Sequence, residues 1–209
     1  MKNPDIKQIT RTAIRFFVYA IVMLIAVMTI HWDGKQEVAL AFGENSMTEY
    51  LQELYLLITA LLFAFSGKYQ KDKQGFTILL SGFFLVLFIR EFDWLFDEIL
   101  HGFWQYPALL VTAGTIGIAL KFKSTIVSGI ASFTRHASFG TFIAGFLTMM
   151  LFSRLFGKGS LWESLMGDHY IRSVKNAAEE GTELLGYSLI LISAIEYFIS
   201  MRKKQEIDQ

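Results

Sequence analysis

The sequence predicts an all-α fold, a polytopic membrane helix bundle of about six transmembrane helices, and three observations support this class. Hydrophobic residues make up 53% of the 209-residue chain, whereas charged residues reach only 18%, below the roughly 25% that is usual for soluble domains. The charges gather between long apolar runs, as they do in membrane proteins. The chain has no cysteine, which excludes disulfides, thiolate metal sites and cysteine nucleophiles.

Six apolar runs approach the length that crosses about 30 Å of hydrocarbon. The first is expected to be a retained span, because no small-residue cleavage site of the signal-peptide type follows it. Glycines bound the polar turn between the second and third runs. No internal repeat or low-complexity tract divides the chain, so residues 1–209 are expected to form a single integral membrane domain. The expected spans are 12–31, 47–66, 76–94, 105–120, 139–156 and 180–200.

Lysine and arginine in short loops predict the orientation of a membrane protein, since they favour the cytoplasmic side. With six spans, thirteen of the nineteen basic residues fall on one side. Both termini are therefore expected in the cytoplasm, and most carboxylates on the outer side. These basic residues are Lys2, Lys7, Arg11, Arg15, Lys68, Lys71, Lys73, Lys121, Lys123, Arg135, Arg202, Lys203 and Lys204.

Four charged residues are expected inside the hydrocarbon. At 1.5 Å per helical residue, Glu53 and Arg90 lie about 22 Å and about 25 Å from the nearest inner-surface lysine. The same measure places Arg154 and Glu183 about 28 Å from the inner surface. Charges at this depth are costly in lipid, so they are expected to face the bundle and pair. The four residues are predicted to form a buried network, either as structural ion pairs or as part of a functional chamber.

A second group of polar residues follows the third span. Asp93, Asp97 and His101 share one stripe of a helix with Arg90 if that helix continues past the membrane surface. Together with Glu180 or Glu183, they are predicted to bind a divalent cation or a cationic headgroup, because the outer side has too few basic residues to neutralise its carboxylates.

Three further glutamates are secondary candidates. Glu49 is one turn from Glu53, but it also follows Ser46 in the pattern of a capping box. Glu98-x-x-His101 is half of the signature of carboxylate-bridged di-metal bundles, and the second half is absent. Glu179 shares a helical face with Glu183.

These residues predict an outward-facing chamber of carboxylates, arginine and histidine, of the kind that a lipid- or envelope-modifying enzyme would use. An ion- or proton-coupled transporter and a non-catalytic assembly subunit are the alternatives. A divalent cation is the one cofactor that the pattern indicates. The lipid bilayer is the expected surrounding, and zero net charge without a basic face argues against nucleic acid. No nucleotide-binding, zinc-protease or serine-hydrolase motif is present.

The segment Glu44-Asn45-x-x-x-Glu49-x-x-Gln52 resembles an uncharacterised group of bacterial multi-span membrane proteins in which such a segment opens a span. Arg90-Glu91-x-Asp93 and Glu180-x-x-Glu183-Leu-Leu-Gly-Tyr are similar to further elements of that group, which brings no known activity. The resemblance implies a multi-pass protein of the bacterial cytoplasmic (inner) membrane. The chain is also faintly similar to the alkaline-ceramidase and progestin-receptor-like membrane hydrolases. That family has an H-x-x-x-H pair on its last span, and this chain does not.

Overall fold

The structure, a computed structural model, describes residues 4–36, 42 and 46–208. These residues form helices joined by short turns, with no strand among them, so the all-α prediction is confirmed. The helices are α1 (Pro4–Asp33), α2 (Met47–Tyr69), α3 (Gln74–Glu91), α4 (Asp93–Asp97), α5 (Gln105–Leu120), α6 (Ile126–Thr134), α7 (Phe139–Leu147), α8 (Ser153–Phe156), α9 (Gly159–Met166) and α10 (Arg172–Asp208). A π-helical segment, Thr148–Phe152, joins α7 to α8 without a break.

Five helical stretches among the described residues have the length and composition of membrane spans. A sixth is present if α5 and α6, which meet at an angle of 89°, count as one broken span. The chain is therefore a multi-pass membrane protein. The five stretches are Asp5–Asp33, Met47–Tyr69, Lys71–Glu91, Phe139–Phe156 and Arg172–Lys204.

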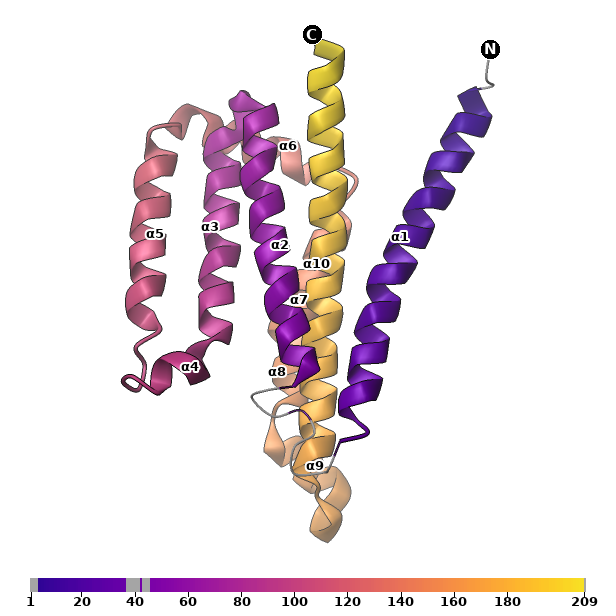
Figure 1. Cartoon of the computed structure of the whole chain (residues 1–209), viewed down its shortest axis with the longest axis vertical. Helices are drawn as coiled ribbons and strands as arrows, with labels where there is room; N and C mark the ends of the chain where they lie inside the picture. Colours follow the sequence, from indigo (N-terminus) through magenta and orange to yellow (C-terminus); the bar gives the residue numbers. More distant parts are fainter. Residues whose placement is uncertain (1–3, 37–41, 43–45, 209) are drawn as a thin grey trace.

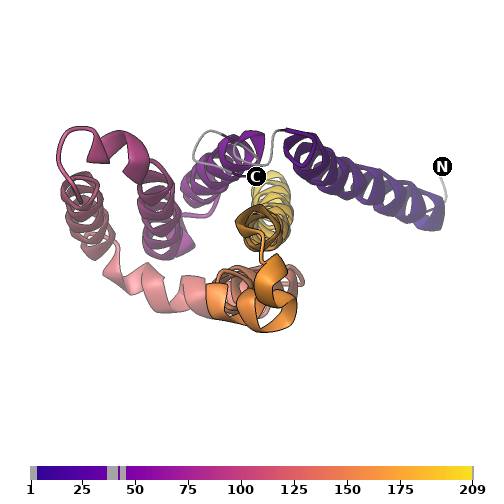
Figure 2. The same ribbon diagram turned by 90° about the horizontal axis from the view of Figure 1, so that it is seen from below.

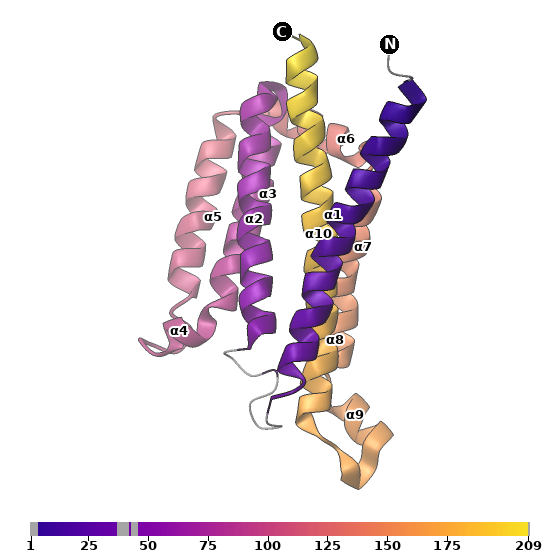
Figure 3. The ribbon, with the colours of Figure 1, turned by 45° about the vertical axis from the view of Figure 1, so that its right-hand side comes forward.

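Helix α10 forms the centre of the bundle. Seen from below, it lies between α1, α2 and the α7–α8 stretch, while α3 and α5 extend the bundle on the far side of α2 (Figure 2). The first residues of α1 and the last residues of α10 lie at the same end of the bundle (Figure 1), which is called the terminal end below. Helix α6 lies across that end (Figure 3).

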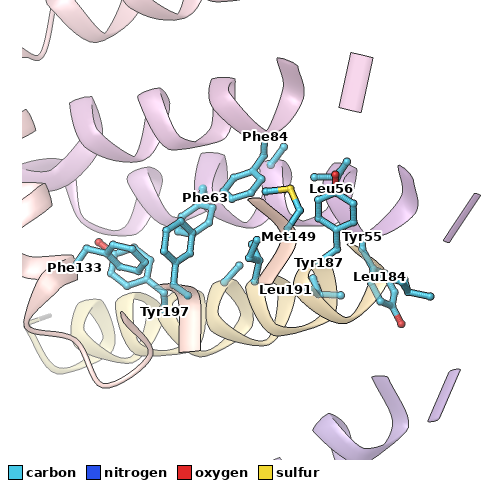
Figure 4. Packing of buried hydrophobic residues seen from close by; sticks show 14 of the residues in the cluster. Tyr55, Leu56, Phe63, Phe84, Phe133, Met149, Leu184, Tyr187, Leu191 and Tyr197 are labelled. Atoms are coloured by element: carbon cyan, nitrogen blue, oxygen red, sulfur yellow. The ribbon is translucent and has the colours of Figure 1, made fainter. Parts of the chain in front are cut away.

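Aromatic side chains fill the middle of the bundle. The ring of Phe63 on α2 stacks on Phe84 of α3 at 5.8 Å and meets Phe133 and Phe142 edge-on. Tyr197 of α10 contacts Phe63 and Phe133 on the terminal side (Figure 4). All five side chains are buried, and each such aromatic pair adds about 0.5–1.5 kcal/mol beyond its buried area. These five residues are called the aromatic layer.

Two glycines bring α7 and α10 into close contact. A Cβ atom on Gly186 would lie 2.8 Å from the carbonyl oxygen of Gly145, and a Cβ on Gly145 would lie 2.7 Å from that of Gly186. Small residues allow this close approach in membrane bundles. The π-helical segment that follows winds less per residue than an α-helix, which keeps Met149 and Ser153 buried on the same side as Gly145.

Helix α1 is anchored to α2 through one buried aspartate. The Asp33 carboxylate accepts hydrogen bonds from Thr48 N at 2.7 Å, Thr48 Oγ1 at 2.6 Å and Met47 N at 3.2 Å. Ser46 caps the same helix by accepting from Glu49 N at 3.2 Å, as its sequence predicts. The first turn of α2 is thus satisfied partly by the last residue of α1, which fixes the hairpin between the two helices.

Candidate functional site

Charged side chains from four helices meet inside the bundle, at the end away from the chain termini. They come from the start of α2, the end of α3, the short helix α8 and the first half of α10. The carboxylate cluster comprises Glu53, Glu91, Glu179, Glu180 and Glu183, and the basic residues in contact with it are Arg90, Arg154 and Lys175.

The ion pair of Arg154 with Glu183 connects α8 to α10. The Nη2 atom of Arg154 lies 2.5 Å from Glu183 Oε1, and the Ser153 hydroxyl lies 3.1 Å from the same oxygen. Ser153 also donates to the carbonyl of Met149. Glu183 is 4% exposed, whereas the Arg154 side chain is half exposed. The depth estimate from the sequence had placed these two charges at one level, and the structure joins them.

Glu91 holds a second charged centre, although it is not among the four residues that the sequence predicts inside the hydrocarbon. Arg90 Nη2 lies 2.6 Å from Glu91 Oε1, and the buried Tyr187 hydroxyl donates to the same oxygen at 2.9 Å. Arg90 thus pairs with its neighbour in the chain and not with Glu53. Adjacent residues do not face each other within a helix, but α3 ends at Glu91, which frees this side chain to turn back. Tyr187 follows Glu183 by one helical turn, a spacing that would have identified it.

Two glutamates of the cluster lack a basic partner among the described residues. Glu180 accepts from Gln52 Nε2 at 3.0 Å, while the same amide nitrogen donates to the Glu180 carbonyl at 3.1 Å. Glu53 is buried and is repelled by Glu91. A carboxyl group buried without a cation must be neutralised by a proton or by a bound cation. Five carboxylates face three basic residues, so the cluster can hold two additional positive charges.

Glu179 completes the cluster at its rim. Its Oε2 atom lies 2.8 Å from Lys175 Nζ, one turn earlier on α10, and its Oε1 atom lies 3.9 Å from Arg154 Nη1. Glu49, the other secondary candidate on this side, lies in the capped first turn of α2.

The expected stripe along a continuous third helix is wrong. Helix α3 ends at Glu91, because Phe92 adopts φ −90° and ψ 20° and leaves the helical conformation. The residues after it form the short helix α4 and a turn that leads back into α5, on the opposite side of α3 from α10 (Figure 1). Asp93, Asp97, Glu98 and His101 lie in this segment.

Asp97 and His101 form contacts within the turn between α4 and α5. The Asp97 carboxylate accepts from Gly102 N at 2.7 Å and lies 2.8 Å from His101 Nδ1. The Gly102 hydrogen bond and His101 together lower the pKa of Asp97. Gly102 has φ +78°, a conformation that glycine adopts at little cost.

The predicted cation site of Asp93, Asp97 and His101 with Glu180 or Glu183 is therefore not assembled. The described residues contain no group of three or more His, Asp or Glu side chains arranged to hold a metal ion. The helix break separates the two halves of the expected site, since it carries the acidic turn away from α10.

No family model, curated protein or solved structure matches this chain. The resemblance to the bacterial membrane protein group stays a prediction that depends on its motifs. Two of their residues, Glu44 and Asn45, lie outside the described residues, while Gln52 and Glu180 contact each other directly.

Proposed function

We propose that this chain is a six-span protein of a bacterial inner membrane whose carboxylate cluster binds an ammonium-bearing polar headgroup from the outer leaflet. The observation that carries the proposal is the excess of five buried or half-buried carboxylates over three basic residues at one level of the bundle. Loop charges favour cytoplasmic termini, and that orientation would put the cluster on the periplasmic side.

A primary ammonium group suits the two glutamates without a basic partner. It is compact, carries three hydrogen-bond donors and no acceptor, and would form charge-assisted bonds with Glu180 and Glu53. Gln52 holds the Glu180 carboxyl by one hydrogen bond at 3.0 Å, which leaves acceptor positions for a ligand. If the protein is a lipid-modifying enzyme, these two carboxyl groups are the ones that would exchange protons with the headgroup.

Proton-coupled transport is a second candidate, favoured by a second polar centre on the same helix. Glu196 of α10 accepts from Tyr19 and pairs with Arg15 at 3.1 Å, thirteen residues beyond Glu183 and therefore about 20 Å along the helix. The aromatic layer lies between the two centres. The buried polar side chains that the structure describes along this stretch, among them Thr59, Ser188 and Ser193, are hydroxyl groups without an ionisable function, and Ser188 and Ser193 donate to backbone carbonyls. A site open to one side fits this arrangement better than a continuous path.

The test compares lipid headgroups in nanodiscs. A ligand that binds only the folded state stabilises it by about 2.7 kcal/mol at a hundredfold excess over Kd. Wild type is expected to melt at a higher temperature in phosphatidylethanolamine than in phosphatidylcholine of the same acyl chains. The Glu53→Gln and Glu180→Gln variants are expected to lose that difference, whereas Glu98→Gln, an exposed change outside the cluster, keeps it.

Equal melting temperatures of wild type in the two lipids would contradict the proposal. So would a Glu98→Gln variant that loses the difference between the lipids as fully as Glu53→Gln and Glu180→Gln do. A rise in melting temperature with Mg²⁺ or Zn²⁺ that a chelator reverses would assign the excess carboxylates to a metal ion instead.

A further inference from the structure

A second site lies at the terminal end of the bundle, between α1, α7 and α10. A cavity of about 370 Å³ is lined there by residues of α1, of α10 and of the segment 137–141. Helix α1 diverges from α10 toward its first residue (Figure 1), and the two views agree on this separation (Figure 3). The cavity is distinct from the carboxylate cluster, because its α10 residue Glu196 lies about 20 Å from Glu183 along the helix.

The polar wall of the cavity centres on Arg15. Its Nε atom lies 3.1 Å from Glu196 Oε1, and Tyr19 donates a hydrogen bond to the same oxygen. Within the described part of the chain, the two terminal guanidinium nitrogens have no hydrogen-bond partner, and the side chain is 44% exposed. Thr12 and Thr141 add hydroxyl groups to the lining. A guanidinium group held by one nitrogen keeps its paired terminal donors for a phosphate or a carboxylate.

The charge around the cavity is positive. Arg11 lies one turn before Arg15, and Arg135 precedes the lining segment by two residues. Burial, then the charges of Arg15 and Lys73, lower the pKa of the nearby His136, which is the response of a base in a positive field. Glu196 is already neutralised by Arg15 within the wall, so the surrounding cations favour an anion.

The depth of Arg15 corresponds to a lipid headgroup. Arg15 and Asp33 are eighteen residues apart on α1, a rise of about 27 Å, so the two charges mark opposite edges of a hydrocarbon core of about 30 Å. Between them most residues of α1 are exposed, and only 6% of its most apolar stretch is buried. Phe16 and Ile192 add apolar surface to the cavity, where an acyl chain would lie.

We propose that this cavity binds an anionic phospholipid, whose phosphate contacts the terminal guanidinium nitrogens of Arg15 and whose acyl chain lies between α1 and α10. Basic pockets between membrane helices recognise such headgroups. The hydroxyl groups of Thr12 and Thr141 would donate to the remaining phosphate oxygens.

Native mass spectrometry of the delipidated protein in detergent, with added phosphatidylglycerol, tests this site. Wild type is expected to retain one phosphatidylglycerol, and Arg15→Gln to bind it about tenfold more weakly, the loss expected for one charge-assisted contact. The control is Lys121→Gln, which removes one exposed positive charge from a residue outside the lining and should leave phosphatidylglycerol binding unchanged. The double variant Arg15→Gln with Glu196→Gln leaves no lone carboxylate and should lose the lipid equally, which separates lipid loss from misfolding.

Three outcomes would overturn the proposal. Equal retention of phosphatidylcholine and phosphatidylglycerol by wild type would show that the site does not select an anion. An equal loss of phosphatidylglycerol binding in Lys121→Gln and Arg15→Gln would reduce the effect to general surface charge. Stabilisation by inorganic phosphate as large as that by the lipid would identify a free-anion site in place of a lipid site.

Discussion

Helices α1 and α10 are both long apolar spans, yet they occupy opposite environments. The most apolar stretch of α1 has a mean hydropathy of 2.4 and is 6% buried, whereas that of α10 has a mean hydropathy of 1.7 and is 61% buried. The less apolar helix is therefore the central one. Lipid tails are as apolar as leucine, so burial inside a membrane bundle depends on close packing and on polar contacts, not on hydrophobicity.

The residues of α10 that lower its hydropathy are the ones that place it at the centre. Gly186 allows contact with α7, while Glu183 and Tyr187 bond to α8 and α3. Helix α1 has few such groups. Its polar contacts with other helices are made by Asp33, by the Val22 carbonyl that accepts from Tyr55 at 3.0 Å, and by Arg15 and Tyr19, which both contact Glu196.

Breaking the charge pair of the central helix should have the largest effect. Arg154→Ala removes the basic residue that pairs directly with the buried Glu183, and breaking a buried pair by removing one partner costs about 3–5 kcal/mol. We expect the free energy of unfolding in mixed detergent micelles to fall by that amount. Arg172→Ala, an exposed change at the start of α10, is the control, and the double variant Arg154→Ala with Glu183→Ala should be milder than Arg154→Ala alone. Equal stability of the two single variants would show that the pair is hydrated.

The same substitution on the two helices tests the comparison directly. Leu191 of α10 is 3% exposed and Leu24 of α1 is 57% exposed. Leu191→Ala is expected to cost about 2–5 kcal/mol because it leaves a cavity, and Leu24→Ala about 0.5 kcal/mol or less. The measurement is again unfolding in mixed micelles. A similar cost at both positions would mean that α1 is covered, by another copy of the chain or by a partner.

The close contact of α7 with α10 predicts a smaller penalty. In Gly186→Ala the new methyl group would lie 2.8 Å from Gly145 O and 2.9 Å from Met149 N, backbone atoms that cannot move separately from their helix. Overpacking of this kind costs about 1–3 kcal/mol. Gly117→Ala on α5 meets no atom within 4 Å and should be neutral or stabilise by up to about 1 kcal/mol. If Gly186→Ala and Gly117→Ala gave the same melting curve, α7 and α10 would have to lie further apart than they do in this structure.

The smallest expected effect is a pH dependence at the terminal end. His136 lies 2.8 Å from the Ser138 hydroxyl and meets the Tyr197 ring edge-on, and burial followed by Arg15 and Lys73 lowers its pKa from 6.5. As the pH falls, the His136 imidazole of the unfolded state therefore takes up a proton before that of the folded state. The free energy of unfolding is at its full value above about pH 6.5 and declines as the pH falls below it. His136→Gln should flatten this decline in melts between pH 7.5 and pH 5, and an unchanged slope would assign it to other groups.

The sequence predicted helices better than their interruptions. The expected range 105–120 coincides with α5, since Lys121 and the aromatic residues before Pro107 mark its ends. The end of α3 was missed because hydrophobic residues continue past Phe92 and the first glycine comes only at Gly102. The π-helical segment, Thr148–Phe152, contains neither glycine nor proline and leaves no mark in the pattern.

The sequence could predict which charged residues of the candidate site lie at the same depth in the membrane. It could not predict the direction in which their side chains point. Equal depth indicated the pairing of Arg154 with Glu183. The partner of Arg90 could not be found in this way, since Glu91 and Glu53 are close to the same level and the choice follows from the helix end at Glu91. Helical spacing likewise grouped Asp97 with Glu183 only on the assumption that α3 continues.

The central position of α10 also affects the order of assembly. It leaves the ribosome after the other spans described above, and until it inserts, Glu53 on α2 and Arg154 on α8 remain in the bilayer without the groups that later surround them. Such exposed polar residues are costly in lipid, so the nascent bundle is least stable just before α10 inserts. A chain that stops before residue 172 would keep four or five hydrophobic segments but lack the helix that joins them.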